Sequence, residues 1–284
     1  MCADMKLRSR WAMLKEIRRF LPFSAIGIMI IIIACLFANF FAPYDPFEIG
    51  LSAPFSPPSW AHISGTDDLG RDLFSRILYG GRITLLISLV ATTIALIIGT
   101  AWGFAAGILK GWTDEFLMRT ADAMMAIPAI LFALVCISGL GASVLSLTVV
   151  AGILLAPSTA RMARSAILVE METDYVIAGI ASGLSRWRLI WNEILPNIAS
   201  QLLVQFSLNA AAAVMLEATL SFIGLGVQPP NASLGTLILQ GYAKIWNSYW
   251  FVLFPGALVT ITILLFNSLG EHVRLSMDSV KSSS

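Results

Sequence analysis

Long apolar blocks without charged side chains dominate this sequence. A helix needs about 20 residues to cross the ~30 Å hydrocarbon core of a bilayer, and five blocks reach that length. Only 12% of the residues are charged, about half the share in a soluble domain. These are too few charged side chains to cover the surface of a water-soluble fold. The sequence therefore predicts an all-α integral membrane protein. The blocks run from Phe20 to Tyr44, Ile83 to Leu109, Ala123 to Ala160, Ile198 to Leu216 with an extension past Glu217 to Val227, and Ile245 to Gly270.

The third block is long enough for two spans. Gly139, Gly141 and Ser143 interrupt it near its middle, and glycine allows a tight turn there. We therefore expect a helical hairpin and about six transmembrane helices in all. The organisation that follows is a tail (1–19), a first transmembrane helix (20–43), an external loop (44–82), a five-helix core (83–270) and a second tail (271–284).

Lysine and arginine are distributed unevenly between the connecting segments. The two tails, the segment from Lys110 to Arg119 and the segment 161–196 hold 14 of the 18 basic residues. Cells retain basic residues on the cytoplasmic side, so we expect both termini and the segment 161–196 in the cytoplasm. A net charge of +1 gives no basic surface for nucleic acid, and the bilayer is the expected environment.

The external loop contains one amphipathic pattern. Asp68 to Leu78 is predicted as a helix with an apolar face, and Asp68 with Arg71, and Asp72 with Arg76, have the spacing of ion pairs. Such a helix lies along the outer surface, where it braces the bundle or meets a partner.

The segment from Arg161 to Asn197 is predicted to contain two short helices separated by Gly183. In the second, Trp187, Ile190, Trp191 and Ile194 recur at helical spacing, and we expect Pro196 to stop that helix. One interpretation is an element that a partner grips; the other is a helix resting on lipid headgroups.

Two carboxylates, Asp122 and Glu217, are expected inside the membrane, where an unpaired charge is costly. Asp122 has Arg119 one turn before it, so we expect these two residues to form a structural pair. Glu217 either lines a translocation path or anchors helices to each other, and the sequence leaves both open. Gly99, Gly103 and Gly107 recur at every fourth residue, which predicts a close helix contact.

Motifs of catalysis and nucleotide binding are missing from the sequence. It contains no Gly-x-x-x-x-Gly-Lys-Ser/Thr loop and no His-Glu-x-x-His or Gly-x-Ser-x-Gly stretch. We therefore expect no catalytic residue, no metal site and no cofactor bound by this chain. An ion-coupled secondary transporter is the alternative class, but that class would leave the long helical segment 161–197 without a task.

Three stretches resemble the binding-protein-dependent ABC permeases of the dipeptide, oligopeptide and nickel type. Residues 175–183 (YVIAGIASG) with 194–197 (ILPN) look like the EAA loop of that family. Residues 65–72 (GTDDLGRD) with 79–82 (YGGR), and residues 217–230 (EATLSFIGLGVQPP), look like signatures of its second permease subunit. Ile177 stands where the family motif has glutamate, and Gly179 stands at its second alanine.

The resemblance implies the architecture of a type I ABC importer permease in the cell inner membrane. It implies a second permease subunit, two ATP-binding subunits that bind the ATP, and an extracytoplasmic solute-binding protein as partners, and peptides, similar small solutes or nickel as cargo. It also implies a loop that couples to the ATPase. The residues assigned to this coupling are Tyr175, Ala178, Gly179, Gly183, Leu184, Trp187, Leu195 and Pro196.

Overall fold

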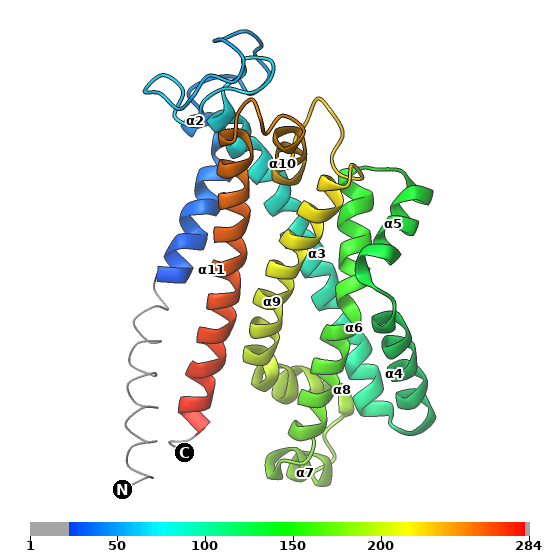
Figure 1. The fold of residues 1–284 in the computed structure, drawn as a ribbon. Helices are drawn as coiled ribbons and strands as arrows, with labels where there is room; N and C mark the ends of the chain where they lie inside the picture. The colour runs from blue at the N-terminus through cyan, green and yellow to red at the C-terminus, as the bar shows by residue number, and fades with distance from the viewer. Residues whose placement is uncertain (1–22, 282–284) are drawn as a thin grey trace, which may run out of the picture.

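Helices form the body of the protein in the computed structural model, which describes residues 23–281 (Figure 1). Among these residues no β-strand is formed, and an isolated bridge joins Thr66 to Asp72. The elements are an apolar helix Phe23–Leu36, α2 (Ala38–Phe41), α3 (Leu73–Leu109), α4 (Gly111–Ala126), α5 (Ala129–Leu140), α6 (Val144–Glu170), α7 (Asp174–Ala181), α8 (Arg186–Leu189), a π-helical turn η1 (Ile190–Ile194), α9 (Leu195–Phe222), α10 (Leu234–Tyr242) and α11 (Trp250–Lys281).

Four helical segments are long and apolar enough to cross a membrane. They are α3, α6, the continuous stretch Ile190–Phe222 and Trp250–Ser276. The pair α4 and α5 adds a further span, bent by 89° at its break. Pro128 precedes α5, and a residue before proline is pushed into extended backbone, as Ile127 is (φ −83°, ψ 129°). The helix Phe23–Leu36 is apolar but shorter than a full span, so the four or five spans together with it are consistent with the predicted count of about six.

The hairpin predicted inside the third apolar block is present. Gly141 turns the chain with a φ of +85°, and the Ser143 hydroxyl caps α6 by accepting the Ser146 N–H at 3.0 Å. The first arm differs from the expectation, because α5 is only 12 residues long and depends on α4 to complete the span.

A glycine seam joins α3 to α6. A Cβ added at Gly99 would lie 2.6 Å from the carbonyl oxygen of Ala156, and one at Gly103 would lie 2.6 Å from that of Ala160. A Cβ at Gly107 would meet Ile167 at 3.1 Å. Small residues at this spacing let two helix backbones approach closely. The predicted close contact is therefore confirmed, and it lies within this chain.

The connecting segments gather at two opposite ends of the bundle. Figure 1 shows the loop between α2 and α3, together with α10, at one end, and α7 with the last turns of α11 at the other. The junction of α3 and α4 also lies at the α7 end (Figure 1). The arrangement agrees with the distribution of basic residues. The α3–α4 junction, α7 and the last turns of α11, which lie in segments predicted to be on one side of the membrane, share one end of the structure.

The separate external helix predicted from Asp68 to Leu78 is wrong. Gly70 has a φ of +69°, which a helix does not allow, and α3 begins only at Leu73. Asp72 is its N-cap, with a carboxylate oxygen that accepts the Ser75 N–H at 2.8 Å. Residues 73–78 are thus the first turns of α3, and the external loop ends ten residues earlier than predicted.

Buried carboxylates fasten the loop between α2 and α3 to the start of α3. Asp67 accepts hydrogen bonds from Arg71 Nε at 2.6 Å and from Arg76 Nη1 at 2.5 Å. Asp72 lies 2.9 Å from Nδ1 of His62. Arg71 also lies 3.7 Å from Asp68, as predicted, but the predicted pairing of Asp72 with Arg76 is wrong, since Asp72 faces the loop as a helix cap.

Candidate functional site

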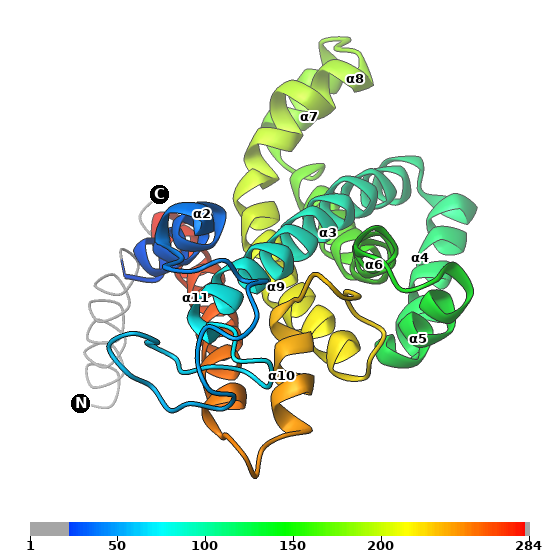
Figure 2. The same ribbon diagram turned by 90° about the horizontal axis from the view of Figure 1, so that it is seen from above.

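The segment between α6 and α9 projects from the bundle as an arm, defined here as residues 171–194. Figure 2 shows α7 and α8 extending away from the packed helices. The arm consists of α7, a turn at residues 182–185, α8 and η1. It belongs to the same end of the molecule as the last turns of α11 (Figure 1).

Gly183 makes the turn at the tip of the arm. Its φ of +81° lies in the left-handed region, which side chains with a Cβ rarely adopt. The N–H of Gly183 donates to Ile180 O at 3.0 Å, and that of Leu184 donates to Gly179 O at 3.1 Å. These bonds close the end of α7 as a Schellman motif does, so the predicted sharp turn is present.

Gly179 allows α7 to close against α8. A Cβ at this position would lie 2.9 Å from Leu189 Cδ1 and 3.2 Å from Leu184 Cδ1. Leu189 is 4% exposed and Val176 is fully buried. The departure from the family alanine at Gly179 therefore has a packing reason in this chain.

Tyr175 ties the base of the arm to two long helices. Its hydroxyl donates to the Glu170 carboxylate at the end of α6 and accepts from Asn197 Nδ2 of α9 at 2.8 Å. Partial burial, together with the bond to Glu170, raises the pKa of Tyr175 above its ordinary value, so the phenol keeps the proton that it donates.

A hydrophobic cluster continues the connection below Tyr175. It joins the buried faces of the arm, α6 and α9. Because buried cores are close-packed and yield little, the arm is held firmly against both helices. The buried members are Ala163, Ala166, Ile167, Val176, Leu189, Ile194, Ile198 and Leu202.

The expectation that Pro196 stops a helix is wrong. The chain stays helical through it, and Pro196 lies in the first turn of α9. A proline breaks a regular helix because its ring clashes with the carbonyl four residues before it. Here Leu195 N–H bonds to Ile190 O, five residues back, so the π turn changes the register just before the proline.

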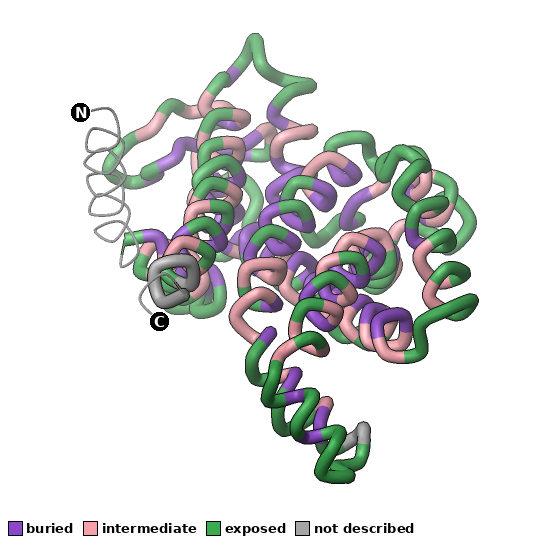
Figure 3. The backbone as a smooth tube through the Cα atoms, turned by 90° about the horizontal axis from the view of Figure 1, so that it is seen from below, coloured by how far each residue is buried: buried purple, intermediate pink, exposed green. Residues whose placement is uncertain are grey.

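Three apolar side chains stay exposed at the tip of the arm, and we call them the tip patch. Ile177 is 53% exposed, Ile180 54% and Leu184 38%. Figure 3 shows exposed backbone at this projecting end and buried positions along its inner side. Ala178 is exposed as well. The side chain of Trp187, which was assigned to the same loop, lies outside the described residues.

Glu217 lies inside the chain, 1% exposed. Thr84 of α3 donates to one carboxylate oxygen at 2.9 Å, and Ser221 donates to the other at 2.6 Å. Thr84 also accepts the N–H of Leu234 at the start of α10 at 3.1 Å. Of the two hypotheses for Glu217, this geometry supports the anchor between helices.

The predicted pair of Arg119 with Asp122 is not formed. Arg119 is exposed and lies 3.8 Å from Glu115, whereas Asp122 lies 3.5 Å from Arg161 of α6. The cause is the packing of α4, which turns Asp122 toward α6 and Arg119 away from it.

A stronger ion pair joins the same two helices. Arg164 of α6 binds both carboxylate oxygens of Asp114 in α4, at 2.5 and 2.6 Å. Bidentate pairs of this kind fix orientation as well as distance. No local pattern predicted this pair, because its partners are 50 residues apart.

A comparison with protein families finds one family whose model matches most of the helical core of the chain. Residues 99–278 match the family described as the binding-protein-dependent transport system inner membrane component. The chain belongs to this family. The resemblance seen in the three sequence stretches is confirmed, and so is the prediction of a membrane permease subunit of a binding-protein-dependent importer.

Relatives of this inner membrane component match over most of their length. The probable D,D-dipeptide transport system permease protein DdpC of Escherichia coli K12 is 38% identical over 255 residues, covering 90% of this chain and 86% of DdpC. The di/tripeptide transport system permease protein DppC of Pseudomonas aeruginosa is 35% identical, covering 88% and 85%. The fold resembles that of the inward-facing MetNI methionine ABC transporter, with a TM-score of 0.59 and 19% identity over 71% of this chain and 95% of that one.

Some residues that hold the arm of this permease had no signal in the sequence. Glu170 lies before the motif-like stretches 175–183 and 194–197, and Asn197 is their last residue. Val176 inside the first stretch and Leu189 between the two are ordinary apolar residues. The pattern of apolar residues locates the second helix of the arm, but only the fold shows which of them meet α6 and α9.

Proposed function

We propose that this chain forms half of the translocation path of an ATP-driven peptide importer and that the tip patch docks onto a separate ATP-binding subunit. The tip patch is the observation that supports this docking most directly. Apolar surface concentrated at a projecting end is typical of a protein interaction site. The names of the relatives, which are dipeptide and di/tripeptide permeases, support peptides as the cargo.

In this proposal the arm lies in the cytoplasm, as do both termini. The tip patch enters the ATP-binding subunit, and the departure at Ile177 replaces a charged contact with an apolar one. The ATP itself is bound by two partner subunits, a second permease subunit encloses the path, and an extracytoplasmic solute-binding protein delivers the cargo.

The connection of the arm to the bundle supports a mechanical role. Closure of the ATP-binding subunits displaces α7, and the Tyr175 hydrogen bonds and the buried cluster pass this displacement to α6 and α9. A rigid-body rotation of packed helices is one of the established ways to change which side of a protein is open. Access to the path would then alternate between the two sides of the membrane.

The test is uptake of a labelled dipeptide into proteoliposomes that contain this chain with its candidate partner subunits and binding protein. We expect uptake that requires ATP on the side of the arm and that persists when ionophores collapse ion gradients. Uptake driven by an ion gradient without ATP would overturn the proposal. Parallel assays with radioactive Ni²⁺ decide whether peptide or metal is the cargo.

A further inference from the structure

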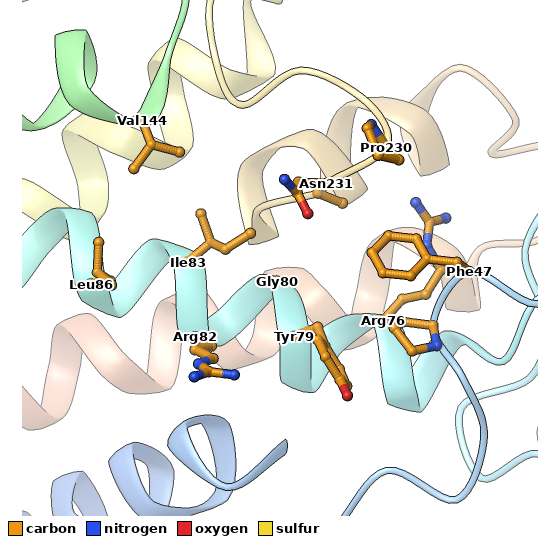
Figure 4. A pocket seen from close by; sticks show the side chains of 12 residues that line it. Phe47, Arg76, Tyr79, Gly80, Arg82, Ile83, Leu86, Val144, Pro230 and Asn231 are labelled. Atoms are coloured by element: carbon orange, nitrogen blue, oxygen red, sulfur yellow. The ribbon is translucent and has the colours of Figure 1, made fainter. Parts of the chain in front are cut away.

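A cavity of about 360 Å³ lies at the end of the molecule opposite the arm. Its volume falls near the lower end of the range for small-molecule sites, about 300–1,000 Å³. The first turns of α3 form one side, and the segments 46–47 and 230–232 with the start of α6 form the others. Figure 4 shows Arg82 and Tyr79 projecting from one edge of α3, and Pro230 and Asn231 beyond its other edge.

The lining of this cavity contains two arginines and no carboxylate. Arg76 is already committed, because its Nη1 binds Asp67 at 2.5 Å and its Nη2 donates to Gln240 at 3.2 Å. Arg82 is exposed, and within the described part of the chain it has no ion pair, whereas Arg71 and Arg76 do. Arg82 therefore offers an uncommitted guanidinium to the cavity.

The remaining lining combines two polar groups with an apolar wall. Tyr79 lies one turn before Arg82 on α3, and the amide of Asn231 lies on the facing segment. The apolar wall consists of Phe47, Ile83, Leu86 and Val144. An occupant that satisfies this lining carries a negative charge at one end and apolar groups beside it.

We propose that this cavity is a subsite for the C-terminal carboxylate of a peptide, with Arg82 as the group that binds it. A guanidinium matches a carboxylate through two parallel hydrogen bonds, and the apolar wall accommodates the adjoining side chains. The proposal rests on the proposed function as a peptide permease, because it assumes that peptide passes this end. It adds a point of recognition in the permease itself, beyond selection by the binding protein.

The first experiment measures ATP-driven uptake of one dipeptide as the free acid and as the C-terminal amide. The same binding protein serves all variants, so its own preference cancels when acid-to-amide ratios are compared. Because a hydrogen bond to a charged group is among the stronger ones, we expect Arg82→Gln to lower the ratio by about 10-fold or more. Arg82→Lys should retain part of the wild-type acid-to-amide ratio. Lys244 is an exposed cation at the same end but outside the cavity, so Lys244→Gln should leave the ratio unchanged.

An unchanged ratio in Arg82→Gln would overturn the proposal. An unchanged ratio together with a higher binding-protein concentration for half-maximal ATPase activity would assign Arg82 to contact with the binding protein instead. A second measurement does not depend on transport. We expect peptide acid, but not the amide, to slow labelling of Asn231→Cys by a membrane-impermeant maleimide, and Arg82→Gln to abolish that protection.

The two measurements also separate this inference from the proposed function. Protection that depends on Arg82, in the absence of ATP-driven uptake, would support the subsite and overturn the importer. ATP-driven uptake without any protection of the cysteine would support the importer and overturn the subsite.

Discussion

Replacing Ile177 and Ile180 by serine tests whether the tip patch is a docking surface. Burying an isoleucine side chain fully contributes about 1.5–3 kcal/mol. The two side chains are 53% and 54% exposed, so docking can bury about half of each and contribute about 1 kcal/mol per residue. We therefore expect each single variant to weaken binding of the ATP-binding subunit about 5-fold, and the double variant about 30-fold.

The assay is the equilibrium affinity of the purified permease complex, held in nanodiscs, for the ATP-binding subunit. Serine and isoleucine have similar helix propensities, so α7 should persist and the thermal unfolding temperature of the permease should not change. Ile177→Leu is the matched control, because it keeps the apolar area, and its affinity should stay within about 2-fold. Wild-type affinity in the double serine variant, or an equal loss in the leucine control, would refute the reasoning.

Three further predictions concern backbone, packing and anchoring. Gly183→Ala forces a residue with a Cβ into a φ of +81°, which costs about 1–2 kcal/mol. Co-purification with the ATP-binding subunit should therefore fall while the bundle stays folded. Gly183→Pro should abolish this co-purification. Gly103→Val overpacks the α3–α6 seam and should lower stability by at least about 1–3 kcal/mol in thermal unfolding, whereas Gly139→Ala, which meets no atom within 4 Å, should change stability little. Glu217→Gln keeps one acceptor oxygen for Thr84 or Ser221, and its amide N–H can donate to the other hydroxyl, so uptake per folded protein should stay near wild type. Glu217→Leu leaves the hydroxyls of Thr84 and Ser221 without their acceptor and should lower the stability by about 1–3 kcal/mol. Normal stability in Glu217→Leu, or lost uptake in a stable Glu217→Gln, would favour the hypothesis that Glu217 lines the translocation path.

Local signals in the sequence predicted much of the fold. The length of the apolar blocks gave the spans, because the hydrocarbon thickness is fixed. Gly141 and Gly183 marked turns that do occur, since each adopts a positive φ that glycine tolerates best. The spacing of Gly99, Gly103 and Gly107 predicted a seam, although the sequence did not reveal that α6 is the partner.

The wrong predictions of ion pairs share one cause. The partners are decided by contacts between segments that are distant in the sequence. Arg76 has suitable partners at helical spacing and still pairs with Asp67, because the loop folds back over the start of α3. Asp122 pairs with Arg161 for the same reason, across two packed helices. The bend between α4 and α5 was missed for a different reason: Pro128 lies near the start of an uninterrupted apolar block, and composition alone does not show that the helix breaks there.

The candidate site follows the same division between local and distant determinants. The turn and the amphipathic pattern of the arm are local, so the segment itself was found. Tyr175 was assigned to coupling only through the family resemblance, and its partners Glu170 and Asn197 come from the two helices that flank the arm. The exposed tip patch required the fold, because apolar residues at helical spacing are equally consistent with burial.

The contacts of α6 indicate which helices move together. The glycine seam locks α6 to α3, the buried cluster locks it to the arm and α9, and Arg164 with Asp114 locks it to α4. A displacement that enters through α7 therefore cannot move α6 alone. In contrast, the helix Phe23–Leu36 contributes no residue to the arm's buried cluster and packs instead in a core with α11, α10, the N-terminal half of α3 and three residues of α9, Ala210, Ala211 and Val214. Because α3 and α9 contribute residues to both cores, we infer that the arm moves α6 and α4 first, and that α3 and α9 carry the displacement on to α11 and the helix Phe23–Leu36.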